Sequence, residues 1–140
     1  MSATPPIGVR LHNPGCMEAG PHDALLYVGE VESTLLPYRQ FIDTPHGFRA
    51  MVECLRAYQR RYKIITIGAA IARWAPVSSG NPTLAYAANV AKACGVQVYQ
   101  QVDFEDLWTP LLQSMSTQEC GDGWFSNSDI ALGISLAGSG

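Results

Sequence analysis

A long amphipathic segment, residues 43–62, limits the folds open to this chain more than any other part of the sequence. Asp43 or Thr44 can cap a helix there, and Pro45 suits its first turn, where no amide hydrogen is needed. Apolar side chains then recur at every third or fourth position: Phe48, Met51, Val52, Leu55, Tyr58 and Tyr62. Because one face of so long a helix must be covered, we expect the rest of the chain to pack around it.

The opposite face of this helix carries charged side chains, including Arg49, Glu53, Arg56 and Arg60. We expect this face to be solvated, so that Arg56→Ala changes the stability little. The basic residues near the helix end (Arg56, Arg60, Arg61 and Lys63) fit cations at the negative end of a helix dipole. The formal net charge of −3 argues against a general nucleic-acid binder.

Four further helices are predicted from their start and stop residues. Thr66 can cap a short helix with Ile67, Ala70, Ile71 and Trp74 on one face, which ends before Pro76. Asn81 can cap the next, which ends at Gly95 and has a small-residue face expected to approach the long helix: Leu84, Ala87, Ala88, Ala91 and Cys94. Another begins after Asp103 or, as Pro110 favours, at Thr109, and ends at residues 119–121. The last is capped by Asp129 and stops at Gly138.

The N-terminal third is predicted to contain little helix. Prolines and glycines make residues 1–24 a region of loops and turns, including the His12–Gly15 turn. Residues 25–31 and 38–42 are short, partly alternating runs that indicate an antiparallel pair. We therefore expect an α+β protein that is mostly helical, with about five helices and a small antiparallel β-hairpin near the N-terminus. Its 140 residues, 47% hydrophobic, can form one domain over 1–140.

The cysteines at 16, 54, 94 and 120 form no C-x-x-C pair, and we expect all four thiols to be free. Cys54 and Cys94 fall within predicted helices, where they fit small buried residues. The first residues have no basic start followed by an apolar run, so we expect synthesis in the cytoplasm without a signal peptide. No segment has the length and apolarity of a membrane span.

Several motifs resemble those of small phage and prophage virion proteins that are credited with a lysozyme-like fold. A G-I-R-x-x-N-P-G-N motif is similar to Gly8–Cys16, and an F-x-Q-F-x-x-P-x-x-G-x-R-A-M segment is similar to Tyr38–Met51. The Y-x-R-R-Y and R-W-A-P motifs are intact at Tyr58–Tyr62 and Arg73–Pro76. A family helix that finishes in H-E-N-G corresponds to Gln118–Gly121, which reads Q-E-C-G. The resemblance covers nearly the whole chain, but Cys16, Gln118 and Cys120 depart from its pattern.

The resemblance implies cleavage of the peptidoglycan glycan strand, as a muramidase or lytic transglycosylase does. That chemistry needs a partly desolvated carboxylic acid to protonate the leaving oxygen, and Glu119 is the candidate. We expect Trp124 or Phe125, in the following turn, to bury it. As an ordinary surface glutamate at a helix end, Glu119 would have no catalytic role.

The second carboxylate, which transglycosylases do not require, stays open among Asp122, Asp129, Glu30 and Glu32. Asp122 and Trp124 are the expected substrate-binding residues near Glu119, together with Arg10 and Asn13 of the N-P-G segment. A purely structural turn is the alternative for Asn13. Trp108 can also stack on a sugar ring, whereas the helical spacing of Trp74 indicates the core.

Other chemistries fit poorly. His12, His22 and His46 lack the spacing of zinc ligands, no phosphate-binding glycine loop is present, and we expect neither metal nor cofactor. Cys120 lacks an activating neighbour for a nucleophile. Two functions therefore stand: a peptidoglycan-cleaving enzyme, or an inactive lysozyme-like virion component or protein-binding module. Either would be virion-associated or delivered to the periplasm, with glycan strands or other virion proteins as partners and with no nucleic acid or membrane.

Overall fold

The computed structural model describes residues 4–20 and 23–139, and His22 and the first three residues lie outside the described part. In chain order its elements are α1 (Ile7–Arg10), β1 (Glu30–Val31), β2 (Gln40–Phe41), α2 (Thr44–Tyr62), α3 (Ile67–Trp74), the 3₁₀ turn η1 (Val77–Ser79), α4 (Thr83–Cys94), the 3₁₀ turn η2 (Phe104–Asp106), α5 (Trp108–Cys120) and α6 (Asn127–Ala137). The prediction of a mostly helical chain with a small antiparallel sheet is confirmed. The described residues form six α-helices rather than about five.

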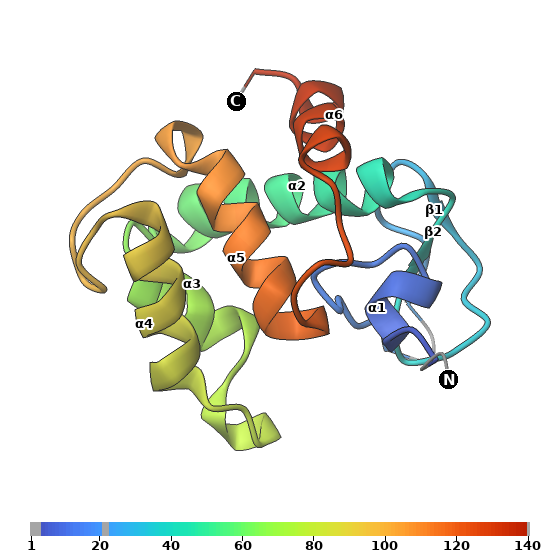
Figure 1. The fold of residues 1–140 in the computed structure, drawn as a ribbon, viewed down its shortest axis with the longest axis horizontal. Helices are drawn as coiled ribbons and strands as arrows, with labels where there is room; N and C mark the ends of the chain where they lie inside the picture. Colours follow the sequence, from blue (N-terminus) through green and yellow to red (C-terminus); the bar gives the residue numbers. More distant parts are fainter. Residues whose placement is uncertain (1–3, 21–22, 140) are drawn as a thin grey trace.

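Helix α2 runs through the middle of the molecule, with α6 above it, α3 and α4 at one end and the small sheet at the other (Figure 1). Asp43 caps it by accepting a hydrogen bond from the His46 amide at 2.9 Å. The predicted apolar stripe is confirmed, because Phe48, Met51, Val52 and Leu55 are fully buried. Only its last member, Tyr62, is largely exposed. The core therefore lies along this face of α2, as its periodicity predicted.

The expectation that the charged face of α2 is solvated is wrong at Arg56. Its side chain is only 11% exposed and donates to both carboxylate oxygens of Glu105, at 2.9 Å each. It also donates to the carbonyl oxygens of Ala137 and Gly138, and its guanidinium lies over the Trp108 ring. Arg56 thus joins α2 to η2 and to the end of α6, tertiary neighbours that helical periodicity cannot reveal.

Helices α3, α4 and α5 pack together beside α2. Thr66 caps α3 as predicted, by accepting from the Ala69 amide. The predicted buried face of α4 is partly wrong, since Leu84 and Ala88 are exposed and the buried residues are Thr83, Tyr86, Ala87, Val90 and Ala91. This face packs chiefly against α3 and α5 rather than against α2. Asn81 does not cap α4, because its side chain instead donates to the carbonyl of Pro76.

Two other helix starts differ from those predicted. Helix α5 begins at Trp108, before Thr109, because Pro110 is tolerated in a first turn, where its missing amide hydrogen is not needed. Helix α6 is capped by Ser126, which accepts from the Asp129 amide, so Asp129 is not the cap. Helix α6 packs against α2, and α5 crosses α2 and also packs against α4 and α6 (Figure 1).

The N-terminal segment is more ordered than its prolines and glycines indicated. Helix α1 lies where only loops were predicted, because Pro6 precedes its first residue and therefore interrupts no helical hydrogen bond. Strands β1 and β2 are antiparallel, with Glu30 opposite Phe41, and they are shorter than the predicted runs. Residues 17–19 run beside residues 37–39, joined by backbone hydrogen bonds and a Glu18–Tyr38 bridge.

Within residues 4–20 and 23–139, no helix combines the length and the apolar character that a membrane crossing requires.

Candidate functional site

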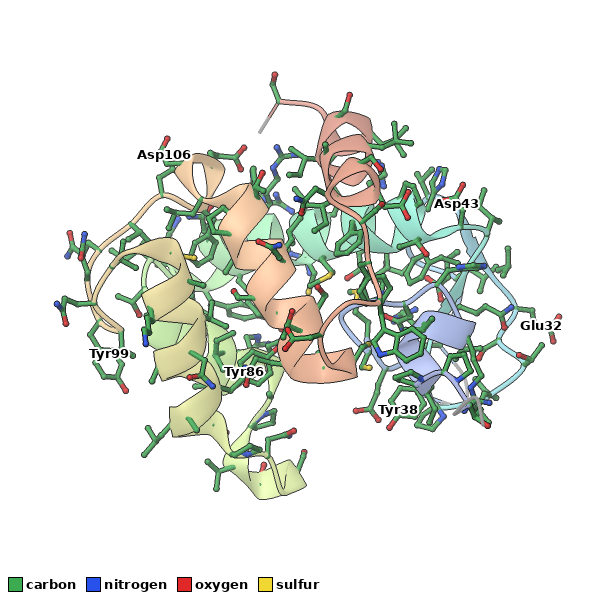
Figure 2. All side chains as sticks on the ribbon, in the orientation of Figure 1. Glu32, Tyr38, Asp43, Tyr86, Tyr99 and Asp106 are labelled. Carbon is green, nitrogen blue, oxygen red and sulfur yellow. The ribbon has the colours of Figure 1, made fainter. Side chains whose placement is uncertain are left out.

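Glu119 lies in the last turn of α5, and its partly buried carboxyl group opens onto a cleft of about 360 Å³. The Tyr86 hydroxyl donates a hydrogen bond to Oε2 of Glu119 at 2.8 Å. Tyr86 reaches it from α4, which lies beside α5 in Figure 2. The buried Tyr86 side chain therefore holds the carboxyl group of Glu119 in place at the edge of the cleft.

Burial raises the pKa of Glu119, because a charged carboxylate is poorly solvated there. The hydrogen bond from Tyr86 acts in the opposite direction, since it stabilises the carboxylate. The negative charge of Glu18 adds to the rise. The net result is a carboxylic acid that keeps its proton to a higher pH than an ordinary glutamate.

The walls of the cleft come from distant parts of the chain. Gly15, Cys16 and Glu18 form one wall, beside Tyr38. The end of α3 and the following loop form the other, with Trp74, Ala75, Ser79 and Asn81. The Trp74 indole N–H donates to the Gly15 carbonyl at 3.2 Å, so one side chain joins the two walls. Trp74 also packs against the core, as predicted.

Asn13 has a structural role, and the structural alternative of the sequence analysis is the correct one. It is fully buried, and its amide nitrogen donates to the carbonyls of Met17 and Arg39 at 2.9 and 2.8 Å. Its side-chain oxygen accepts from the Met17 amide. Because its amide nitrogen and oxygen both bond to backbone groups, Asn13 stabilises the turn that precedes Glu18 and does not face a ligand.

The other predicted substrate-binding residues do not meet Glu119 in the cleft. Arg10 is exposed and donates to the Pro5 carbonyl. Asp122 and Trp124 line a separate hollow of about 260 Å³ between α5 and α6. Phe125 packs edge-on against Phe48, with 5.5 Å between the ring centroids. The prediction that Trp124 or Phe125 buries Glu119 is therefore wrong, because the chain reverses after Gly121 and carries both rings away from the cleft.

None of the carboxylates considered as a partner for Glu119 lines the cleft. Glu30 is buried in an ion pair with Arg39, at 2.8 Å. Glu32 is exposed at the far edge of the hairpin region (Figure 2). Asp129 belongs to the first turn of α6, and Asp122 lies in the separate hollow.

Glu18 is the cleft carboxylate that the sequence analysis missed. It is exposed, lines the same cleft as Glu119 and lies close enough to raise its pKa. The sequence feature that pointed to Glu18 was its position just after the turn at Asn13, which sets the direction of the following residues. Without the pairing of residues 17–19 to residues 37–39, that signal could not be interpreted.

All four cysteines are free, as predicted. Cys54 and Cys94 are half-buried and Cys120 is buried at the end of α5. Among residues 4–20 and 23–139 no three His, Cys, Asp or Glu side chains are grouped in a way that could hold a metal ion. The cleft itself contains the carboxyl groups of Glu18 and Glu119, the hydroxyls of Tyr38 and Ser79, and the Cys16 thiol.

Comparison with known proteins shows that this chain is similar to a phage protein. No family model matches it. It is 31% identical over 128 residues to Protein P5 of Pseudoalteromonas phage PM2, a match that spans 91% of this chain and 79% of that protein. The chain therefore belongs to the same family as the phage protein P5.

Proposed function

We propose that this chain is a phage protein that cleaves the glycan strand of peptidoglycan, with Glu119 as the general acid. One observation carries the proposal: a partly buried carboxyl group with a raised pKa faces an open cleft. A general acid must hold a proton near the working pH and deliver it to the leaving oxygen, and desolvation supplies the first condition. The lysozyme-like fold implied by the sequence motifs is part of the same proposal.

The facing carboxylate, Glu18, takes the second role in this mechanism. Glu119 protonates the glycosidic oxygen as the bond to the sugar carbon breaks, and positive charge develops on the sugar ring. Glu18 is exposed and lines the same cleft, where its negative charge stabilises that ring or activates an attacking water. Tyr86 orients the Glu119 carboxyl group through its hydrogen bond to Oε2.

The test is release of soluble fragments from purified sacculi by the wild type, Glu119→Gln and Asp122→Asn. Glutamine keeps the shape of Glu119 but cannot donate its proton, so the rate should fall by roughly 10²-fold or more. Asp122→Asn is the matched control, because it also neutralises a carboxylate near the end of α5 but lies outside the cleft. Wild-type activity should decline as the pH rises through the raised pKa of Glu119.

A second candidate is an inactive virion component or protein-binding module, which fits the phage relationship equally well. It is favoured by exposed apolar side chains in the segments around β1 and β2: Leu25, Leu26, Val28, Leu36 and Ile42. Exposed apolar groups gathered in one region are typical of surfaces that contact other proteins. Under this function the wild type releases no fragments, Glu119→Gln behaves identically, and replacing Leu26 and Leu36 by serine weakens association with other virion proteins.

A further inference from the structure

Two thiols from opposite ends of the chain meet beneath α1, beside the cleft. A Cβ atom built on Gly8 would lie 2.5 Å from the Cys120 sulfur and 3.1 Å from the Cys16 sulfur. Because both sulfurs lie so near one point, they are neighbours in space, and each thiol shifts the pKa of the other. Cys120 in turn points toward the Pro14 carbonyl, 3.8 Å away.

The surroundings hold this pair in place. Gly8 is buried, and a side chain there would collide with the Cys120 sulfur and with the Asn13 carbonyl oxygen, and would crowd the Cys16 sulfur. Glycine at this position therefore leaves room for the two thiols. Cys16 follows the turn that Asn13 fixes, and Cys120 is the last residue of α5.

We propose that Cys16 and Cys120 are a redox site and form a disulfide on contact with a small-molecule disulfide. Cys16 lines the cleft and is the more accessible thiol, so it exchanges first. Its thiolate attacks one sulfur of the oxidant, which forms a mixed disulfide and releases one thiol. Cys120 then attacks the Cys16 sulfur and releases the second thiol. The two protein thiols are oxidised by two electrons, and the oxidant is reduced to two thiols.

The disulfide would fasten the wall that contains Cys16 to the end of α5 that contains Glu119. It would close a loop of roughly 100 residues, and constraining so long a loop in the unfolded chain stabilises the folded state considerably. This inference concerns thiol chemistry and does not depend on glycan cleavage.

The test is incubation of the purified reduced protein with glutathione disulfide, followed by alkylation and peptide mapping by mass spectrometry. We expect one intramolecular crosslink, between the peptides that contain Cys16 and Cys120, with Cys54 and Cys94 alkylated. The melting temperature of the oxidised protein should exceed that of the reduced protein by roughly 10 °C. The first exchange should be slow at neutral pH, because the neighbouring Cys120 thiol and burial raise the pKa of Cys16.

The matched control is the double variant Cys54→Ala/Cys94→Ala, which should form the same crosslink and show the same thermal shift. Cys16→Ser and, as a second variant, Cys120→Ser should each lose both. A wild type that stays fully alkylatable, carries glutathione on Cys16 without closing the crosslink, or joins other cysteine pairs would overturn the proposal. None of these readouts uses activity on sacculi, so the outcome is separate from that of the Glu119 experiment.

Discussion

Replacement of Arg56 by alanine should destabilise the fold substantially, although the residue belongs to the charged side of α2. Arg56 donates to both oxygens of Glu105 and to two carbonyls at the end of α6. A hydrogen bond involving a charged group contributes about 1.5–3 kcal/mol. The Glu105 side chain is 32% exposed, which reduces its ion pair toward the roughly 0–1 kcal/mol of a surface pair. We therefore expect Arg56→Ala to lower the free energy of unfolding by about 2–3 kcal/mol, mainly through the α6 carbonyls.

Urea denaturation followed by circular dichroism measures this difference directly. Arg60→Ala is the control, because Arg60 lies one turn later on the same helix and is exposed, and its loss should remain within about 0.5 kcal/mol. Arg56→Lys should recover only part of the loss, since an ammonium group cannot make the two parallel bonds to Glu105. Equal stabilities for the Arg56→Ala and Arg60→Ala variants would refute the argument that Arg56 holds α6 against α2.

Two further predictions concern the core and the cleft. Leu55→Ala should lower the free energy of unfolding by about 2–5 kcal/mol in the same assay, because Leu55 is fully buried and its truncation leaves a cavity; a loss under about 1 kcal/mol would contradict this packing. Glu119 should make stability depend on pH. Its raised pKa means that the folded state keeps a proton that the unfolded chain has released, so wild-type stability falls as the pH rises above the usual glutamate range. Glu119→Gln does not titrate and should gain stability relative to the wild type as the pH rises above the usual glutamate range, whereas a constant difference would count against a buried carboxyl group.

The helices were predictable where local chemistry decides them. Residues 43–62 carry both the periodicity and the Asp43 cap of α2, and Thr66 sets the start of α3 in the same way. Where several residues could start a helix, the choice depended on tertiary neighbours. Asn81 is engaged with Pro76 and so does not cap α4, and the face of α4 was misassigned because its partners are α3 and α5.

The candidate site was predictable only in its central residue. Glu119 could be found because it lies near the end of an apolar helix, just before a glycine turn, but its surroundings could not. Glu18 and Tyr86 reach it from segments about a hundred and about thirty positions away, and only the packed structure brings them together. Asp122 and Trp124 are nearer in sequence, yet the turn after Gly121 separates them from the cleft. Proximity along the chain was therefore a poor guide to proximity in space.

The pairing of distant segments at the cleft also sets the order in which the molecule can be completed. During synthesis residues 7–18 leave the ribosome well before the groups that close the cleft over them, which lie at the end of α3 and in the last turn of α5. Closing so long a loop has an entropic cost, and the contacts made by these later segments offset it. Gly8 and the Cys16 thiol therefore become covered only after residue 120 has been made and α5 has docked.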